Sequence, residues 1–365
     1  MSRYLIEAYQ ALEAYVPGEQ PQDMQYVKLN TNESPYPPSP AVLNAAAEEA
    51  SRLQLYSDPA CAALRDAIAG LYGVRRENVY VSNGSDDILN FAFMAFAGKG
   101  GRAYFPDISY GFYRVFGDLY GCAYETIPLE QDFRIDPSKY HHRDGLVVIA
   151  NPNAPTGLAL SAAQIEDIVR TNADHVVLID EAYVDFGAES VAPLTAKYDN
   201  LLVVQTFSKS RSMAGARLGF AIADAGLIAD LDRIKYCTNP YNVNRMTLAA
   251  GEAAIRENDY YMANCGRIVE TREATAATLR GMGFEVLPSR SNFIFVQYPP
   301  EGAPEGLDGA SLYRALKVRG VLVRHFSSPR IANYLRVTIG TPEEMRALTD
   351  ALRDILGAAG RQREE

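Results

Sequence analysis

The chain has 365 residues, of which 48% are hydrophobic, and it carries a formal net charge of −10 at pH 7. This length and apolar content are typical of more than one lobe built around a substantial core. Lysine and arginine never cluster in a run, so the charge pattern argues against a nucleic-acid partner. No apolar stretch approaches the roughly 20 residues that span a bilayer, and the N-terminus lacks the apolar core of a signal peptide. We therefore expect a cytoplasmic protein with no membrane partner.

The cysteines do not form a recognisable metal or disulfide pattern. Cys61, Cys122, Cys237 and Cys265 are widely separated, with no C-x-x-C pair and no nearby histidine cluster. Zinc sites usually place their ligands in short, paired spacings. We expect reduced cysteines and no metal site.

The N-terminal part of the chain combines an irregular arm with two helices. The first forty residues are rich in Pro, Tyr and Asn and must drape over a core formed elsewhere. Ser39 is expected to cap one helix, because Pro40 follows at the first helical position. Either Ser57 or Asp58 is expected to cap a second helix, which ends before Gly73.

Strand and helix patterns then alternate as far as residue 207. The segments are 79–81, 88–96, 102–105, 110–120, 146–150, 161–170, 176–180 and 201–207. Such alternation predicts an α/β fold with a mainly parallel, seven-stranded type of sheet covered by helices on both faces.

The pattern changes after residue 223 and indicates a smaller α+β lobe. Long amphipathic helices are expected between 244 and 279, with further helices at 311–319 and 342–356. Strands are expected at 284–287, 293–296, 321–324 and 335–339. The predicted domains are therefore a large cofactor-binding unit at 41–258, and a second unit that joins the N-terminal arm, 1–40, to 259–365.

Two of the predicted strands end on charged residues. The first leads into Asp180 and Tyr183, and the second leads into Lys209, with Arg217 eight positions further on. Ligands of open α/β sheets bind at the carboxyl ends of the strands. Taken singly, each residue is more simply a solvated strand end, but the set matches the needs of a pyridine aldehyde phosphate. The amine would form a Schiff base, the aspartate would pair with the ring nitrogen, the tyrosine would meet the ring oxygen and the arginine would bind the phosphate.

Further residues suit the phosphate and the ring. Gly84-Ser85-Asp86 follows a short strand and opens a helix, which places backbone N–H groups and the helix dipole at an anion site. Thr206 and Ser208 could add hydroxyl contacts. Tyr110 could stack on a flat cofactor, although a tyrosine among aromatic neighbours can equally belong to the core.

Together these motifs resemble the fold-type I pyridoxal-phosphate aminotransferases, and within them the histidinol-phosphate aminotransferases. The matching segments are 29–40 (LNTNESPYPPSP), 84–86 (GSD), 151–157 (NPNAPTG), 180–183 (DEAY), 206–209 (TFSK), 217–220 (RLGF), 242–244 (NVN), 291–293 (SNF), 320–324 (GVLVR) and 335–340 (LRVTIG). The resemblance covers nearly the whole chain.

The resemblance implies a role for each matching residue. Lys209 would be the Schiff-base lysine, Asp180 the partner of the ring nitrogen, and Tyr183 a hydroxyl on the ring oxygen. The implied contacts to pyridoxal 5′-phosphate are Ser85, Asp86, Tyr110, Asn153, Asp180, Tyr183, Thr206, Ser208, Lys209 and Arg217. Tyr56 resembles a tyrosine that reaches the cofactor phosphate of the partner subunit, which implies a homodimer. The implied substrate contacts are Tyr15, Asn32, Arg324 and Arg336.

Two departures from the family pattern stand near these residues. The family usually has Asn directly before Pro-Thr-Gly, where it bonds the ring oxygen, and this chain has Ala154. Either Asn153 substitutes for it, or Tyr183 and water carry that bond alone. Ser210-Arg211 stands where the family commonly has a small residue and an aromatic, so Arg211 adds a charge near the site.

The function expected from the resemblance is transamination between L-histidinol phosphate and 2-oxoglutarate, which is a step of histidine biosynthesis. An aromatic amino acid aminotransferase is the first alternative, because its substrates are also anionic and aromatic. A phospho-amino-acid decarboxylase on the same scaffold is a more distant one. A cofactor-binding regulator without turnover would need a DNA-binding module, for which the N-terminus has no room.

Overall fold

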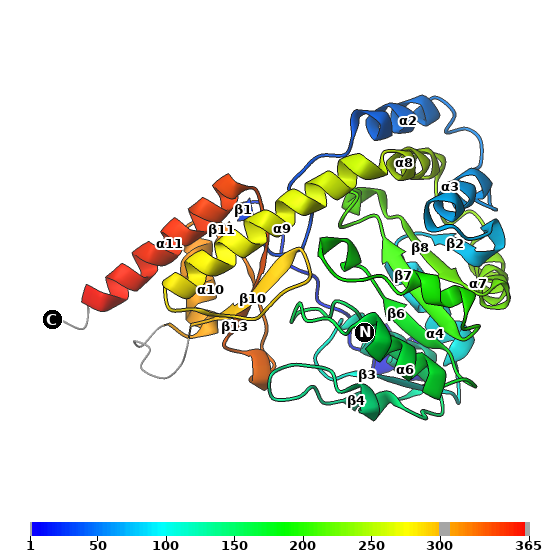
Figure 1. Cartoon of the computed structure of the whole chain (residues 1–365), viewed down its shortest axis with the longest axis horizontal. Helices are drawn as coiled ribbons and strands as arrows, with labels where there is room; N and C mark the ends of the chain where they lie inside the picture. The colour runs from blue at the N-terminus through cyan, green and yellow to red at the C-terminus, as the bar shows by residue number, and fades with distance from the viewer. Residues whose placement is uncertain (1, 299–306, 362–365) are drawn as a thin grey trace.

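The computed structural model describes residues 2–298 and 307–361, and its larger part is built around a seven-stranded sheet (Figure 1). The strand order is β2-β8-β7-β6-β5-β3-β4. The bounds are Val79–Ser82 for β2, Gly219–Ala223 for β8, Leu201–Thr206 for β7, Val177–Asp180 for β6, Leu146–Ala150 for β5, Arg102–Pro106 for β3 and Ala123–Ile127 for β4. The five strands from β7 to β4 run parallel, and β8 is antiparallel to both of its neighbours. The predicted fold class is confirmed.

Helices cover both faces of this sheet because successive side chains of each strand point to opposite sides. Val147 and Ile149 of β5 join one core cluster, whereas Leu146 and Val148 join the other. The first cluster includes side chains of α2 (Pro40–Ala50), α3 (Ala62–Tyr72), α6 (Ala162–Thr171) and α8 (Arg245–Arg256). The second includes side chains of α4 (Ser85–Phe96), α5 (Phe112–Tyr120) and α7 (Ala225–Thr238).

Some predicted boundaries and elements were wrong. The second helix begins at Ala62, later than expected, because the Asp58 carboxylate accepts N–H groups from Ala60 at 3.0 Å and from Ala62 at 2.8 Å and so forms a turn before the helix. Its predicted end is confirmed, since Gly73 adopts a left-handed φ of 66°. The helix predicted from Tyr110 begins at Phe112. Strands β4 and β8 and helix α7 were not predicted.

In the residues that the structure describes, the smaller part of the molecule contains two sheets (Figure 1) and the three helices α9 (Asn258–Gly281), α10 (Gly309–Val318) and α11 (Pro342–Arg361). An antiparallel sheet has the order β12-β13-β10-β9, with bounds Arg324–His325, Tyr334–Thr338, Phe293–Gln297 and Glu285–Val286. The strand predicted at 321–324 is divided, because Val321–Leu322 forms β11 in a different sheet from β12.

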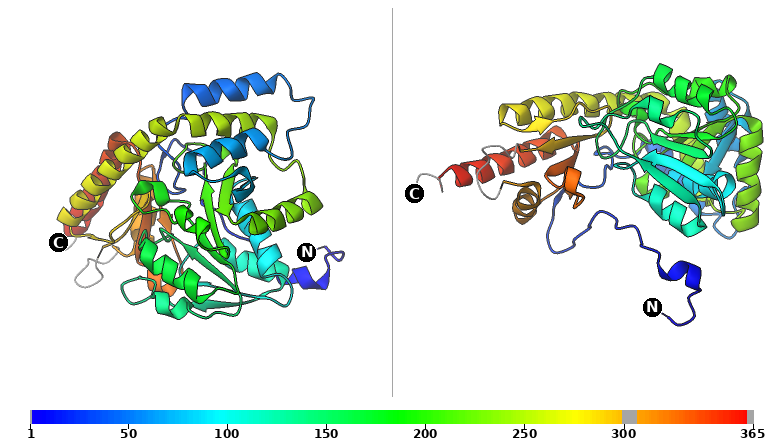
Figure 2. Two further views of the ribbon diagram at one scale, coloured as in Figure 1. Left: turned by 45° about the vertical axis from the view of Figure 1, so that its right-hand side comes forward. Right: turned by 90° about the horizontal axis from the view of Figure 1, so that it is seen from below.

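The N-terminal arm packs with this smaller part, as the sequence predicts. Strand β1 (Val27–Lys28) pairs in parallel with β11, and Leu29 is fully buried in the same core cluster as Val321. The first residues, which include the short helix α1 (Glu7–Gln10), extend away from this contact (Figure 2). Along α9, Tyr261 belongs to the core of the large sheet and Cys265 to the core of the smaller part. The domain division near residue 258 stays a prediction. No helix in the described ranges is both long and apolar enough to span a membrane.

Candidate active site

A cavity of about 690 Å³ lies at the carboxyl ends of β5, β6 and β7 and is closed on its other side by the N-terminal arm and by β12 and β13. The predicted site residues that line it are Tyr15, Asn32, Ser85, Asp86, Tyr110, Asp180, Tyr183, Thr206, Ser208, Lys209, Arg217, Arg324 and Arg336. Two others, Asn153 and Tyr56, do not line it. The fold therefore brings most of the predicted set together, and their chemical roles stay predictions.

Asp180 ends strand β6 and presents a buried carboxylate to the cavity. Its exposed fraction is 5%, and it accepts hydrogen bonds from the Tyr113 hydroxyl at 2.8 Å and from the Ala182 N–H at 3.1 Å. Burial raises the pKa of this carboxyl to about 6, because the two hydrogen bonds only partly replace water. A cationic N–H placed in the cavity beside Asp180 would stabilise its charged form.

Lys209 follows strand β7 and places a primary amine in the cavity. Its Nζ donates to the Thr31 carbonyl at 3.3 Å and lies 5.8 Å from the centre of the Tyr183 ring. Among the described residues no carboxylate lies within ion-pair distance of this amine. The amine of Lys209 therefore lines the cavity without a charged partner among the described residues, and its predicted reaction with an aldehyde stays a prediction.

An anion site forms where α4 begins. Gly84 has a φ of 86°, and a Cβ at this position would stand 2.8 Å from Nη2 of Arg217. Arg217, itself left-handed at a φ of 54°, donates to the Ser208 hydroxyl at 3.3 Å and pairs with Asp86 at 3.0 Å. The missing side chain at Gly84 lets the guanidinium lie against the first turn of the helix, next to Ser85. Free N–H groups of a helix start, an arginine and hydroxyls together match a phosphate.

Aromatic and polar contacts complete this side of the cavity. The Tyr110 hydroxyl donates to Asp86 at 2.8 Å, and burial raises the pKa of Tyr110, which keeps the phenol neutral. The Thr206 hydroxyl accepts the N–H of Ser208 at 3.1 Å. Within the described residues, no group of three or more His, Cys, Asp or Glu side chains is arranged to hold a metal. These residues therefore suit a flat ring that carries a phosphate.

The opposite side of the cavity holds two arginines on adjacent strands. Arg324 and Arg336 are direct partners in the β12–β13 register. Arg324 donates to the carbonyls of Val16 and Pro17 at 3.1 Å, and Arg336 donates to the Asn30 carbonyl at 3.1 Å. The Nε of Arg336 is buried, and no described residue accepts a hydrogen bond from it.

Burial lowers the pKa of Arg336, with a smaller contribution from the neighbouring charge of Arg324. No carboxylate in the described part of the chain pairs with either of them. Two cations this close to each other favour an anionic ligand. Tyr15 stands beside them, with its ring stacked on Phe112 at 4.4 Å.

Asn153 is buried beside the cavity but does not line it. Its Oδ1 accepts from the Ser109 hydroxyl at 2.8 Å, and its Nδ2 donates to the Ile108 carbonyl at 3.0 Å and to the Thr156 hydroxyl at 3.1 Å. The amide is thus hydrogen-bonded within the surrounding loop, and it is Ala154 that lines the cavity. Whether Asn153 or Tyr183 contacts the ring oxygen stays a prediction.

Tyr56 lies outside the cavity of its own chain. Its exposed fraction is 79%, and its ring stacks on Tyr241 at 4.5 Å. The loop around it is held by Arg245, which donates to the Tyr56 carbonyl at 2.8 Å. The expected contact with a partner subunit stays a prediction.

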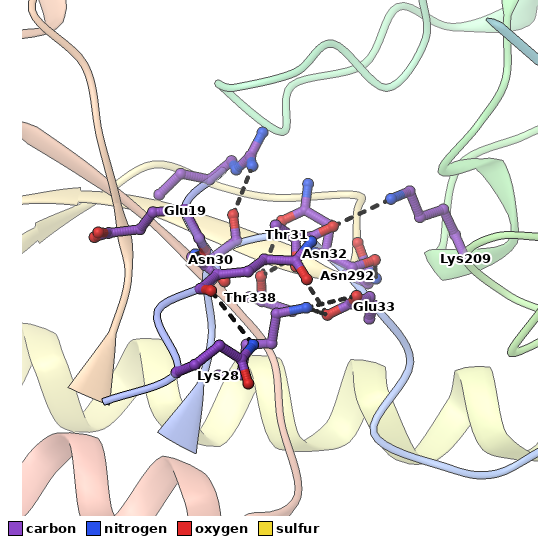
Figure 3. A network of polar contacts seen from close by, with 12 residues as sticks. Glu19, Lys28, Asn30, Thr31, Asn32, Glu33, Lys209, Asn292 and Thr338 are labelled. Carbon is purple, nitrogen blue, oxygen red and sulfur yellow. Dashed lines mark hydrogen bonds and ion pairs between the residues drawn. The ribbon is translucent and has the colours of Figure 1, made fainter. Parts of the chain in front are cut away.

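The N-terminal arm supplies site residues that the sequence reasoning did not name. Figure 3 shows the segment from Lys28 to Glu33 lying between Lys209 and the small sheet. Glu33 lines the cavity and accepts from Lys28 at 2.6 Å and from the Thr31 hydroxyl at 2.8 Å. The pairing of Lys28 with Glu33 has no local sequence signature; only the position of Glu33 in the Asn-Thr-Asn-Glu motif could have indicated it.

Comparisons with known proteins agree with this geometry. Residues 24–352 match the family described as aminotransferase class I and II. The chain is 49% identical to the histidinol-phosphate aminotransferase of Brachyspira hyodysenteriae, over 98% of this chain and 99% of the relative, and 49% identical to that of a Marinomonas species, over 97% and 100%.

A solved structure shares the fold at lower identity. The histidinol-phosphate aminotransferase of Sinorhizobium meliloti, in complex with pyridoxal 5′-phosphate, superposes with a TM-score of 0.87 at 23% identity, over 98% of this chain and 99% of that one. The sequence matches over nearly the full length place the chain in a family: it belongs to the class I and II aminotransferases, and among them to the histidinol-phosphate aminotransferases.

Proposed function

We propose that the protein transfers the amino group of L-histidinol phosphate to 2-oxoglutarate, with pyridoxal 5′-phosphate as cofactor, and so forms imidazole-acetol phosphate and L-glutamate. The observation that carries this proposal is the identity of 49% over nearly the whole length to relatives named for this reaction. The arginine pair in the cavity supports it, because both substrates are anionic.

Different residues of the cavity would hold different parts of the cofactor. Ser85, Ser208 and Arg217 would bind the phosphate, and Tyr110 would lie against the ring. The Asp180 carboxylate would keep the ring nitrogen protonated, since a charged partner lowers the cost of its burial. When bound, pyridoxal phosphate supplies an electron-withdrawing ring that stabilises negative charge at the substrate carbon bearing the amino group.

Lys209 has two tasks in this proposal. Its Nζ would hold the cofactor through the aldehyde until a substrate amine displaces it. The freed amine can then act as a general base that takes a proton from the substrate carbon, and afterwards as a general acid that delivers it to another atom. Its weak contact with the Thr31 carbonyl at 3.3 Å leaves it free to move between these positions.

The substrate end would be bound by Tyr15, Arg324 and Arg336. The phosphate of histidinol phosphate and the carboxylates of 2-oxoglutarate would occupy this place in turn, so that one cationic pocket serves both halves of the reaction. Arginine suits this exchange because its planar fork binds either anion through two parallel hydrogen bonds.

The proposal includes a cytoplasmic homodimer with the domain boundaries predicted above. Tyr56 would reach the cofactor phosphate of the partner subunit, which fits a side chain that is largely exposed on its own chain and held in place by Tyr241 and Arg245.

A spectral titration tests the function. Protein loaded with pyridoxal phosphate is mixed with L-histidinol phosphate, with phenylalanine or with tyrosine, and its visible absorbance is followed as the cofactor gains the amino group. We expect the second-order rate constant for conversion of the cofactor to its amino form to be highest with histidinol phosphate. Faster conversion by phenylalanine or tyrosine would replace the proposed substrate with an aromatic amino acid. Release of carbon dioxide from a phospho-amino acid without amino transfer would replace the reaction.

A further inference from the structure

Asn32 links the N-terminal arm to the hydroxyl of Tyr183. Figure 3 shows Asn32 together with its partners Thr338 and Asn292. The residue is 1% exposed and adopts a left-handed φ of 58°, which asparagine tolerates better than most side chains. Its carbonyl accepts from Nδ2 of Asn292 at 3.0 Å. Asn32 is therefore held on several sides before any ligand binds.

Three hydrogen bonds connect the backbone of Asn32 to the Tyr183 hydroxyl by way of Thr338. The N–H of Asn32 donates to Oγ1 of Thr338 at 2.9 Å, and a backbone N–H can only donate. The hydroxyl of Thr338 in turn donates to Oδ1 of Asn32 at 3.0 Å. Because Oδ1 faces Thr338, the amide must turn its Nδ2 toward the Tyr183 hydroxyl, also at 3.0 Å. These contacts orient the amide with Oδ1 toward Thr338 and Nδ2 toward Tyr183.

This arrangement determines what the Tyr183 hydroxyl can do. Its oxygen accepts a hydrogen from Asn32, so its single hydrogen is available to another group. No acceptor for that hydrogen is found among the residues that the structure describes, and Tyr183 lines the cavity. The hydroxyl is therefore set to donate into the cavity.

We propose that Asn32 and Thr338 are positioning residues that fix Tyr183 as a hydrogen-bond donor toward the cofactor ring oxygen. The role is specific to what this chain contains, because Ala154 offers no side-chain donor to the ring and Asn153 is occupied in its loop. The inference rests on the proposed cofactor but not on the identity of the substrate.

The test measures a property of the bound cofactor that simple anchoring of the arm would not change. A donor to the ring oxygen stabilises the negative charge there, so its loss should raise the pH at which the visible absorbance of the bound cofactor changes. For Thr338→Val we expect a rise of about one pH unit and a roughly tenfold weaker cofactor affinity, measured by equilibrium dialysis of the cofactor-free protein. Thr338→Ser keeps the hydroxyl and should restore both values.

A double-mutant cycle with Tyr183→Phe tests whether Thr338 acts on the cofactor through Tyr183 or independently of it. Tyr183→Phe alone should raise the same pH midpoint, and Thr338→Val added to it should produce no further rise. Asn32→Gly is a second way to remove the hydrogen bond to Tyr183. Glycine has no side-chain amide, it tolerates the left-handed backbone at this position, and Thr338 stays intact. This variant replaces Thr338→Val in the test if Thr338→Val does not fold, since Thr338→Val leaves the buried N–H of Asn32 without an acceptor.

Asn292→Ala is the control for anchoring, since it removes the contact to the Asn32 carbonyl and leaves the path to Tyr183 unchanged. It should lower stability without moving the pH midpoint. The inference is overturned if Thr338→Val and Tyr183→Phe shift the midpoint additively, or if Asn292→Ala shifts it as much as Thr338→Val. Wild-type protein that gains no pH-dependent visible absorbance with pyridoxal phosphate would instead refute the proposed function.

Discussion

The two sides of the cavity are built in different ways. On the side of the large sheet, Asp180, Lys209 and the start of α4 lie within a few residues of strand ends. Here charges of both signs are present: Arg217 pairs with Asp86 at 3.0 Å, while Asp180 and Lys209 form no ion pair among the described residues. On the side of the small sheet, Arg324 and Arg336 face residues 15–33, which lie about three hundred positions away in the chain.

This difference indicates which side of the cavity determines substrate specificity. The first side carries both carboxylates and cations, and its predicted ligand is the cofactor, which every substrate shares. The second side has two cations without carboxylate partners in the described residues, so its electrostatic balance depends on the substrate. Variants on the first side should therefore affect every substrate, whereas variants on the second side should distinguish between substrates.

The largest effect should come from the first side. Lys209→Ala removes the amine that would hold the cofactor and move the proton, so we expect turnover to fall by at least roughly 10²–10⁴-fold with either substrate. The fold should survive, because the amine makes one contact of 3.3 Å. The measurement is turnover together with a thermal melt. Turnover at the wild-type rate would show that Lys209 has neither role.

Asp180→Asn should have the next largest effect. The neutral amide no longer favours a protonated ring nitrogen, so we expect the rate to fall about 10²–10³-fold while the cofactor stays bound. The loss should be equal in both half-reactions, as expected for the cofactor side. Near-normal turnover in either half-reaction would contradict the role of this carboxylate.

The arginine pair should separate the two half-reactions. We expect Arg336→Ala to impair the reaction with 2-oxoglutarate most, and Arg324→Ala to impair the reaction with histidinol phosphate most, each by about ten- to a hundredfold in kcat/KM. Both half-reactions are measured by single-turnover spectroscopy for each variant. Equal losses in both half-reactions for both variants would mean that the two arginines act as one site.

The smallest effect concerns stability in the absence of cofactor. The Asp180 pKa is raised from 3.8 to about 6, so the native carboxyl binds its proton more tightly than the unfolded one. Its contribution to stability is therefore greatest below about pH 4 and is lost as the pH rises toward 6. Asp180→Asn should avoid this loss and stabilise the cofactor-free protein by about 1–3 kcal/mol at pH 7.

Urea unfolding of both proteins at pH 4 and pH 7 measures the effect. The variant should still lose some stability between pH 4 and pH 7. Burial also raises the pKa of Glu181, to about 7, and this lowers the free energy of unfolding in the same direction as the pH rises. Pyridoxal phosphate should reverse the order of stability at pH 7, since it binds the wild-type carboxylate. A variant less stable than wild type at both pH values would contradict the expected cost of this buried charge.

The sequence by itself was sufficient for features that depend on neighbouring residues. The strands that end at Asp180 and before Lys209, and the cap at Ser39, follow from runs of apolar residues and from turn chemistry. Edge strand β4 was missed because its exposed and half-buried side chains, in the sequence AYETI, give no clear apolar pattern. Strand β8, with the sequence GFAIA, contains small residues that carry little strand preference.

Only the tertiary structure decided which polar groups face the cavity. Asn153 and Ala154 are adjacent in the sequence, yet the asparagine turns into its loop and the alanine lines the site. Likewise, the contact of Asn32 with Tyr183 joins residues 151 positions apart and depends on Thr338, another 155 positions along the chain. Local patterns determine strands and caps because their energies come from neighbouring residues, whereas a hydrogen-bond direction between distant segments exists only after the chain has folded.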